Sequence, residues 1–282
     1  MQEIPSTVQP ETLSKYHKLQ DTLRSMGRVA IAYSGGVDSA FLARVARDVL
    51  DGNAFAVLGV SPTVAHSELK DARELAREFG LTLVELATNE LSNPNYVSNP
   101  TNRCYFCKTE LFEQIRIWSD QEGIEWICDG ANADDRSDWR PGSQAAQEKS
   151  VRSPLAEIGL TKDEIRPLSR MLGLPTWDKP SIACLGSRFP YGSSITLEAL
   201  SQLDQAEDLL RSLGFRQLRV RHHGDIARIE LDPADIPRML DEDIRTRVVV
   251  GFKQLGYKFV ALDLAGYRTG SMNIHLQEKP GK

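Results

Sequence analysis

A glycine-rich loop constrains this chain more than any other stretch of its sequence. The segment AYSGGVDSA (32–40) follows the apolar run RVAIAY (28–33) and leads into a helical pattern, SAFLARVARDVL (39–50). Two adjacent glycines let the backbone turn tightly and bring its N–H groups toward an anion. The positive end of the following helix points at the same place. A strand, a glycine-rich turn and a helix in this order predict a phosphate-binding loop.

The side chains of the loop narrow the kind of phosphate site. Ser34 and Ser39 add hydroxyl donors, and Asp38 can hold a metal ion or orient a phosphate-bound water. The loop has neither the lysine of a Walker loop nor the glycine spacing of the dinucleotide fingerprint. SGGVDS instead resembles the signature of the PP-loop ATP pyrophosphatases. This resemblance implies ATP and Mg²⁺ as cofactors, with attack on the α-phosphate and release of pyrophosphate. The residues assigned to ATP are Ser34, Gly35, Gly36, Asp38, Ser39 and, from a later loop, Gly130.

The first two-thirds of the chain alternates strand-like and helix-like stretches. The predicted strands are 28–33, 54–60, 81–87 and 125–130, and the predicted helices include 66–80, 109–123 and 161–175. This alternation predicts an α/β fold, a doubly wound parallel sheet with helices on both faces. The ligand of such a sheet lies beyond the carboxyl ends of its strands.

The loop DGANADD (129–135) follows the fourth predicted strand and therefore belongs at the same end of the sheet. Gly130 allows close backbone approach, and Asn132 and Asp135 offer polar contacts. A polar loop stabilised by its own Asx turns is an equally good interpretation.

The last third has a different order of elements. An irregular segment with prolines and glycines (175–194) precedes an amphipathic helix (196–215), a hairpin (216–232) and a final strand (258–264). We therefore predict two domains: residues 1–192, the PP-loop domain, and residues 193–282, a smaller α+β domain. Alternation along the hairpin puts Arg219 and Arg221 on one strand face, with Glu230 on the other strand. A solvated, salt-bridged outer face is the alternative.

Composition limits the classes of partner. The formal net charge of −5 argues against a dedicated nucleic-acid binder. No window reaches the apolar length that spans a bilayer, and no basic, apolar leader opens the chain. We therefore predict a cytoplasmic protein that binds neither nucleic acid nor membrane. Cytoplasmic thiols are kept reduced, so its cysteines are better read as ligands or nucleophiles than as structural disulfides.

The chain has four cysteines. Cys104 and Cys107 lie in NRCYFCK, Cys184 lies in KPSIACLGSRFPYG, and Cys128 lies in the apolar strand EWICDG, where cysteine acts as a small hydrophobe. By itself the Cys-x-x-Cys pair fits a redox pair, half of a zinc site, two ligands of an iron–sulfur cluster, or core residues.

These motifs together resemble one family, the LarE-type sulfur transferases. The matching stretches are YSGGVDSAFLA, NRCYFCKTELF, DGANADDRSDWRPG, KPSIACLGSRFPYG, RVRHHGDIARIE and GYRTGSMN, spread over residues 33–273. The resemblance implies ATP-dependent adenylylation of a carboxylate of pyridinium-3,5-biscarboxylic acid mononucleotide. A sulfur then displaces AMP and leaves a thiocarboxylate, a step in nickel-pincer nucleotide biosynthesis. It also suggests a homo-oligomer.

The same resemblance assigns roles to individual residues. Cys184 occupies the position of the attacking sulfur, which in single-cysteine members is cut from the side chain. Arg219 and Arg221 are assigned to the phosphate and carboxylates of the substrate, because arginine grips such groups bidentately. Two neighbours of Cys184 are candidates for the same anionic cluster, and one acidic residue is a candidate metal ligand: Ser187, Arg188 and Glu230.

Three cysteines in motif context favour a further interpretation. A zinc site usually has four ligands, whereas three thiolates suit a [4Fe–4S] cluster with one iron left open. Cys104, Cys107 and Cys184 are then the cluster ligands, and the open iron delivers the sulfur. Two alternatives remain: a PP-loop tRNA thiolase that uses a [4Fe–4S] cluster, and a nucleotide-binding sensor without catalytic activity.

Overall fold

The computed structural model describes residues 8–137, 141–180 and 183–268. The chain divides into two compact units. The first draws on Met1–Ser61, Ser67–Asn93 and Asn102–Ile182, and the second on Pro62–His66, Pro94–Thr101 and Ala183–Lys282. Residues 183–192, which the sequence analysis assigns to the first domain, cluster with the second unit.

A four-stranded parallel sheet forms the centre of the first unit. Its strands are β1 (Val29–Tyr33), β2 (Ala54–Val60), β3 (Thr82–Ala87) and β4 (Trp126–Cys128), in the order β3-β2-β1-β4. Every residue of β1 is buried, as expected for a central strand covered on both faces. Strand β1 pairs with β2 on one side and with β4, which comes later in the chain, on the other side. The α/β class predicted from the sequence is therefore confirmed, and a topological switch point lies between β1 and β4.

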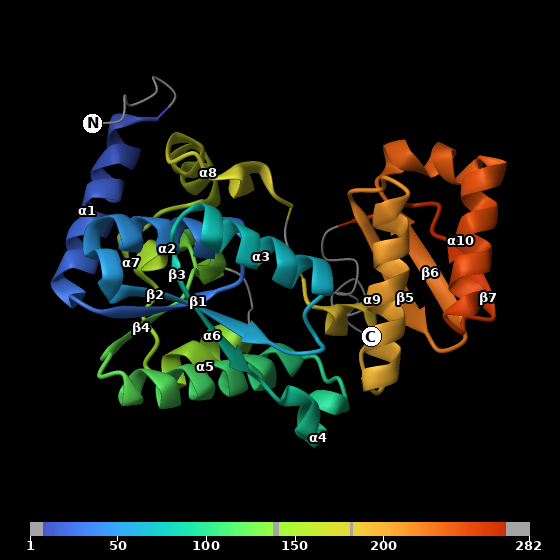
Figure 1. Ribbon diagram of the computed structural model, residues 1–282, viewed down its shortest axis with the longest axis horizontal. Coiled ribbons are helices and arrows are strands. Elements are labelled where there is room, and N and C mark those ends of the chain that lie inside the picture. The colour runs from blue at the N-terminus through green and yellow to red at the C-terminus, as the bar shows by residue number, and fades with distance from the viewer. Residues whose placement is uncertain (1–7, 138–140, 181–182, 269–282) are drawn as a thin grey trace, which may run out of the picture. The chain divides into compact units, whose positions relative to one another are not determined.

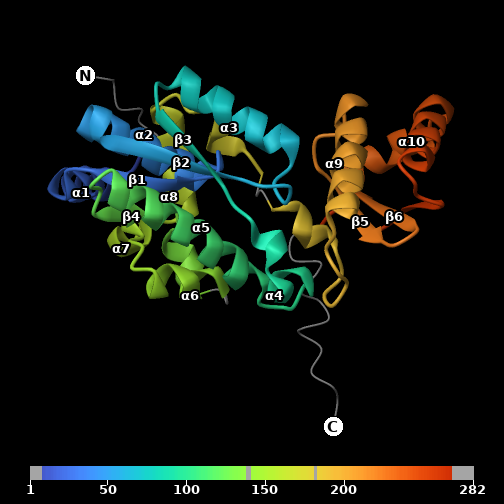
Figure 2. The same cartoon turned by 60° about the horizontal axis from the view of Figure 1, so that its bottom comes forward.

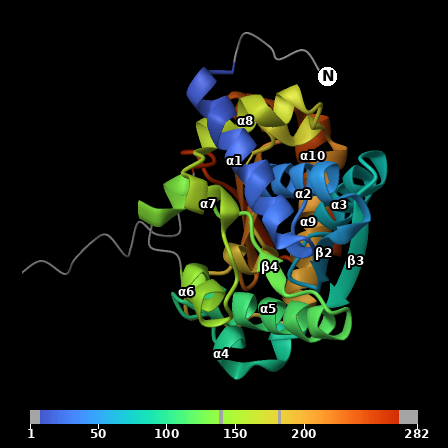
Figure 3. The same cartoon turned by 90° about the vertical axis from the view of Figure 1, so that its left-hand side faces the viewer.

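Helices cover both faces of this sheet. Figure 1 shows α2 (Val37–Leu50) on one side and α5 (Arg103–Gln121) on the other, and Figure 3 agrees. Helix α6 (Pro141–Glu148) packs against α5 (Figures 2 and 3). The remaining helices of this region are α1 (Pro10–Met26), α3 (His66–Glu78), α7 (Pro154–Ile158) and α8 (Lys162–Met171), with short 3₁₀ turns η1 (Asp51–Asn53), η2 (Glu90–Ser92), η3 (Ala133–Ser137) and η4 (Pro175–Asp178).

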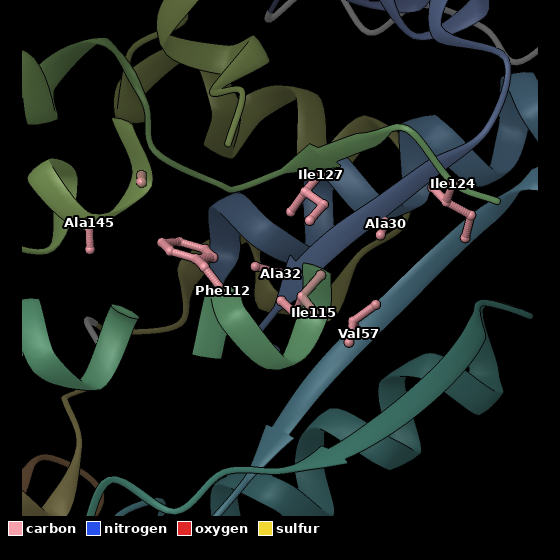
Figure 4. Close-up of a cluster of buried hydrophobic side chains, with 9 residues drawn as sticks. Ala30, Ala32, Val57, Phe112, Ile115, Ile124, Ile127 and Ala145 are labelled. Carbon is pink, nitrogen blue, oxygen red and sulfur yellow. The ribbon is translucent and has the colours of Figure 1, made fainter. Parts of the chain in front are cut away.

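A buried apolar cluster fixes α5 against the sheet. Phe112 and Ile115 of α5, both fully buried, lie against side chains of the strands, among them Ala32 and Val57 (Figure 4). The other members of the cluster are Ala30, Ile124, Ile127, Ala145 and Ala146. This packing holds the N-terminal turns of α5, which carry the Cys-x-x-Cys pair, in a fixed orientation.

Helix α5 begins earlier than the sequence pattern indicates. The expected helix was 109–123, with the two cysteines before it, but the structure starts the helix at Arg103. No glycine or proline interrupts NRCYFCK, and Tyr105 packs against the apolar cluster, so the helix extends over this stretch. Cys104 and Cys107 therefore lie on the helix, three positions apart and on the same face. A Cys-x-x-Cys that opens a helix is also the arrangement of redox pairs, so the position of the two cysteines on α5 fits that alternative as well as a metal site.

The second unit is built around a small mixed sheet. Its strands are β5 (Leu218–His223), β6 (Ile226–Leu231) and β7 (Phe259–Leu262), with β5 and β6 antiparallel and β6 and β7 parallel. The hairpin predicted around Gly224 is present, and Gly224 has a φ of 62°. The helices are α4 (Pro94–Val97), α9 (Leu197–Ser212) and α10 (Glu242–Gln254), with 3₁₀ turns η5 (Leu185–Arg188) and η6 (Pro233–Leu240). Thr196 caps α9 by accepting a hydrogen bond from the N–H of Ala199.

Within residues 8–137, 141–180 and 183–268, no helix combines the length and the apolar character that a bilayer crossing needs.

Candidate active site

The glycine-rich loop lies at the carboxyl end of β1, in a conformation that requires glycine. Gly35 has a φ of 69°, and a Cβ added there would come within 2.8 Å of the Cβ of Ala72. The hydroxyls of Ser34 and Ser39 lie 3.0 Å apart, and the N–H of Ser34 donates to the Ser39 hydroxyl at 3.1 Å. Gly36 is the N-cap of α2 and has no side chain to cap it. Backbone N–H groups of the first turn are thus available to an anion.

The loop after β4 approaches the same place. A Cβ added at Gly130 would lie 2.8 Å from the backbone nitrogen and 3.0 Å from the Cα of Ser39. The ends of β1 and β4 therefore meet at the switch point, which is where open α/β sheets bind ligands. Asn132 and Asp135 mostly stabilise their own loop. The Asn132 side-chain oxygen accepts from the N–H of Asp134 at 2.9 Å, and Asp135 accepts from the N–H of Asn132 at 3.1 Å.

Lys162, which the sequence analysis did not single out, contacts the glycine-rich loop. Its Nζ lies 2.5 Å from one carboxylate oxygen of Asp38. Lys162 is the first residue of α8, where a capping box between Thr161 and Glu164 fixes the helix start. In the sequence, the pattern TKDE predicts that a helix begins at this position, but it does not indicate that Lys162 contacts Asp38.

Asp38 has a second carboxylate oxygen with no hydrogen-bond partner among the described residues. This oxygen, Oδ1, is buried. A buried carboxylate oxygen without a partner is costly and calls for an explanation. Magnesium and calcium ions bind carboxylate oxygens, so Asp38 fits the metal-holding role that its position in SGGVDS predicts.

The cysteines of the first unit differ in exposure. Cys104 is exposed, Cys107 is partly buried, and Cys128 is fully buried. The Cys128 thiol donates to the sulfur of Met26 at 3.8 Å, and burial raises the pKa of Cys128 to about 12. Cys128 is therefore a protonated core residue, as predicted, and is not available as a thiolate ligand.

Cys128→Ala is expected to destabilise the protein by about 1 kcal/mol, because it removes one buried atom and leaves a small cavity. The midpoint of urea unfolding measures this loss. The native variant should also show as many thiols reactive toward an aromatic disulfide reagent as the parent. A reactive thiol lost on substitution would show that Cys128 is accessible, contrary to this assignment.

In the second unit, Cys184 is partly buried and directly precedes η5. Its carbonyl oxygen accepts three hydrogen bonds: from the N–H of Ser187 at 2.9 Å, from the Ser187 hydroxyl at 2.8 Å, and from Arg188 Nη1 at 2.9 Å. The N–H of Leu185 donates to the carbonyl of Thr63 at 2.8 Å. The backbone at Cys184 is thus held on both sides of the residue.

Arg188 is buried and forms a two-point ion pair. Its side chain is 2% exposed and that of Glu207 is 0% exposed, with Nε–Oε1 and Nη2–Oε2 distances of 2.8 and 2.9 Å. Burial acts to raise the pKa of Glu207, but Arg188 and Arg211 more than offset it, so the pKa is lowered. Glu207 is therefore ionised at neutral pH.

The two arginines of the hairpin have different surroundings. Arg221 is buried and donates to Glu230 at 2.8 Å and to the carbonyl of Ser187 at 2.9 Å. Arg219 is partly exposed, and its guanidinium lies over the ring of Tyr267, 5.2 Å from the centroid. Burial and the nearby charge of Arg188 lower the pKa of Arg219. Arg219 is thus the arginine of this pair with solvent-facing surface.

Glu230 is surrounded by positive charge. Its two oxygens pair with Arg221 at 2.8 Å and with Arg228 at 3.1 Å, and the residue is 1% exposed. A metal ion bound to Glu230 would have to replace one of these arginines. The assignment of Glu230 as a metal ligand stays a prediction.

Gly266 and Tyr267 begin the motif GYRTGSMN. Gly266 has a φ of 68°, and a Cβ there would lie 2.8 Å from the carbonyl oxygen of Leu231. The N–H of Tyr267 donates to the same carbonyl at 2.7 Å, which brings its ring under Arg219. Residues 269–273 of this motif, 138–140 of DGANADDRSDWRPG and 181–182 of KPSIACLGSRFPYG lie outside the described residues.

The three predicted cluster ligands are divided between the units: Cys104 and Cys107 belong to the first and Cys184 to the second. Over the described ranges, no group of three or more His, Cys, Asp and Glu side chains is arranged to hold a metal ion. The [4Fe–4S] cluster stays a prediction.

Comparison with known proteins identifies relatives along most of the chain. A family model described as NAD synthase matches residues 14–98. An uncharacterized protein of Synechocystis sp. is 46% identical over 260 residues, covering 92% of this chain and 97% of the relative. The pyridinium-3,5-bisthiocarboxylic acid mononucleotide synthase of Lactiplantibacillus plantarum is 36% identical over 261 residues, covering 92% of this chain and 94% of its own length.

Proposed function

The chain belongs to the LarE-type family of ATP-dependent sulfur transferases, and we propose that it converts a carboxylate of pyridinium-3,5-biscarboxylic acid mononucleotide into a thiocarboxylate. The likeness to a synthase of the bisthiocarboxylic acid mononucleotide carries this proposal, because it extends over both units of the chain. The product serves the biosynthesis of a nickel-pincer nucleotide cofactor. We place the reaction in the cytoplasm, on a homo-oligomer.

The first half-reaction activates the carboxylate. A carboxylate oxygen of the substrate attacks the α-phosphorus of ATP, pyrophosphate leaves, and an acyl-adenylate forms. The first turn of α2, whose N-cap Gly36 has no side-chain cap, offers backbone N–H groups to the phosphates, and the hydroxyls of Ser34 and Ser39 lie beside it. Asp38 would hold Mg²⁺, which when bound neutralises phosphate charge. Lys162 adds a positive charge beside the same carboxylate.

The second half-reaction exchanges oxygen for sulfur. A sulfur nucleophile attacks the acyl carbon, the bond to AMP breaks, and AMP leaves with the electron pair. Arg219 and Arg221 are the groups we assign to the phosphate and carboxylates of the substrate, with Ser187 in the same cluster. Arg188 is buried in its ion pair with Glu207 and is not assigned to the substrate. Cys184 is the residue that presents the sulfur, either as a ligand of a cluster or from its own side chain. In the second case the attack gives a thioester, and loss of the Cys184 Cα proton then breaks the Cβ–Sγ bond, which releases the thiocarboxylate and leaves dehydroalanine.

We propose that three of the four cysteines bind an iron–sulfur cluster. Cys128 is buried and protonated, so the proposal draws on the chain's other three cysteines. Cys104 and Cys107 lie three positions apart on one face at the N-terminal end of α5. These two and Cys184 would hold a [4Fe–4S] cluster, whose open iron when bound supplies a site for an extra sulfide.

The decisive experiment is a reaction of the anaerobically prepared protein with ATP, Mg²⁺ and the pyridinium mononucleotide. We expect pyrophosphate release and a product in which one sulfur replaces one oxygen, both seen by mass spectrometry. About four irons per chain and an intact Cys184 after turnover support the cluster. Conversion of Cys184 to dehydroalanine without bound iron contradicts the cluster and supports the sacrificial route. Absence of any thiocarboxylate contradicts the whole proposal. A parallel reaction with unmodified tRNA in place of the mononucleotide tests the tRNA thiolase, which a thiolated base would support.

Arg219→Ala is expected to weaken substrate binding by about 100-fold, since a charge-assisted, bidentate contact is worth about 3 kcal/mol. The Michaelis constant for the pyridinium mononucleotide measures this effect. Arg216→Ala, a change of an exposed arginine before the hairpin, is the matched control and should leave the constant unchanged. Equal constants for Arg219→Ala and the parent would remove Arg219 from the substrate site.

A further inference from the structure

The segment that carries Cys184 is attached to the rest of its unit by a buried charge. Arg188 Nη1 donates to three oxygens around this cysteine: the carbonyl of Ala183 at 2.6 Å, the carbonyl of Cys184 at 2.9 Å, and the Ser187 hydroxyl at 3.0 Å. One guanidinium nitrogen therefore fixes the backbone on both sides of the Cys184 Cα.

The other edge of the same guanidinium is fixed by Glu207. Besides its two bonds from Arg188, the Glu207 carboxylate accepts from Arg211 Nη2 at 3.0 Å and from the backbone N–H of Val220 at 3.1 Å. Glu207 lies on helix α9 and Val220 on strand β5. The pair thus connects an irregular segment, rich in glycine and proline, to two regular elements.

Stability alone does not account for this pair. Removing two charges from water is expensive, and well-packed apolar side chains in place of a buried ion pair are often neutral or stabilising. Arginine contributes instead a rigid planar fork with five N–H donors. Here the fork reaches the carboxylate with Nε and Nη2 while Nη1 reaches the cysteine segment. A lysine has no such fork and cannot reproduce this set of contacts.

We propose that Arg188 and Glu207 are positioning residues that hold Cys184 in the orientation needed for sulfur transfer. This inference rests on the proposed function, and it revises the role expected for Arg188: it acts on the cysteine-bearing backbone. Adenylylation uses the glycine-rich loop of the first unit, so the pair is expected to affect the sulfur step and leave pyrophosphate release unchanged.

The test uses the full chain with the pair replaced in two ways. Arg188→Met combined with Glu207→Leu removes both charges together and keeps the volume apolar, so neither charge is left buried alone. Arg188→Lys keeps a positive charge but loses the fork. Arg211→Gln is the matched control, because it removes one partner of Glu207 that does not touch the cysteine segment.

Four measurements separate positioning from folding. We expect single-turnover thiocarboxylate formation to fall about 100-fold in both replacements, the scale of loss when a reacting group is misplaced. Pyrophosphate release and the Michaelis constant for the pyridinium mononucleotide should match the parent. Without any substrate, alkylation of Cys184 by iodoacetamide, followed by peptide mass mapping, should accelerate about tenfold because the segment opens locally.

The outcomes are distinct. Sulfur transfer at the parental rate in Arg188→Lys, with unchanged alkylation of Cys184, overturns the proposal. Equal losses of pyrophosphate release and sulfur transfer also overturn it, because they indicate a general structural role. If the parent itself makes no thiocarboxylate, the proposed function fails, while the alkylation rates still decide whether the pair holds Cys184.

Discussion

Replacing Cys184 with alanine is expected to lower thiocarboxylate formation by about 10⁴-fold, the scale of loss seen when a catalytic nucleophile is removed. Both routes for the sulfur lead to this result. If Cys184 donates its own sulfur, the donor is absent. If it is a cluster ligand, the cluster loses one of three thiolates. Pyrophosphate release should continue for one turnover, since the residues assigned to ATP lie elsewhere in the chain.

The structure explains why this variant should stay folded. The hydrogen bonds at position 184 are made by the backbone carbonyl, which alanine retains, and no side-chain cap of η5 is lost. Measurement of pyrophosphate and thiocarboxylate in the same single-turnover reaction tests the expectation. Cys128→Ala is the control, because it removes a cysteine of the buried core. Parental sulfur transfer by Cys184→Ala would exclude Cys184 from the reaction.

Gly130→Ala is expected to reduce pyrophosphate release about 100-fold. The new Cβ would meet the backbone nitrogen of Ser39 at 2.8 Å and its Cα at 3.0 Å. Real Cβ atoms do not approach backbone this closely, so the glycine-rich loop or the end of β4 must move. A displacement on the ångström scale at a reacting centre costs about two orders of magnitude in rate. Overpacking should also destabilise the fold by about 1–3 kcal/mol.

Gly52→Ala is the matched control for this variant. Gly52 does not have a positive φ, and a Cβ added there meets nothing within 4 Å. Its rate of pyrophosphate release should equal that of the parent. Initial rates at saturating ATP, together with the urea unfolding midpoint, separate a local effect at the loop from a general loss of stability. A normal rate in Gly130→Ala would place the ATP phosphates away from the junction of β1 and β4.

In the hairpin, the sequence predicts which face each side chain lies on but not how deeply the side chain is buried. Alternation along the strands puts Arg219 and Arg221 on one face of the first strand, and the register pairs Arg219 with Glu230 of the second. It does not distinguish a solvated arginine from a buried one. Only packing gives Arg221 its two protein acceptors and leaves Arg219 partly exposed over Tyr267. The difference arises because burial depends on which elements cover a face, and that information lies elsewhere in the chain.

The sequence by itself determined the features that depend on near neighbours: a glycine-rich turn between a buried strand and a helix, four strands alternating with helices, and a hairpin at Gly224. Each strand, helix or turn among them is encoded within about twenty residues by periodicity and turn chemistry. The start of α5 was missed because the apolar support of Tyr105 comes from other elements. Lys162 pairs with Asp38, which lies 124 positions away in the sequence. Arg188 pairs with Glu207, which belongs to a different structural element. Only the tertiary structure decided such pairs. The sequence around a charged residue does not indicate which distant side chain will pack beside it.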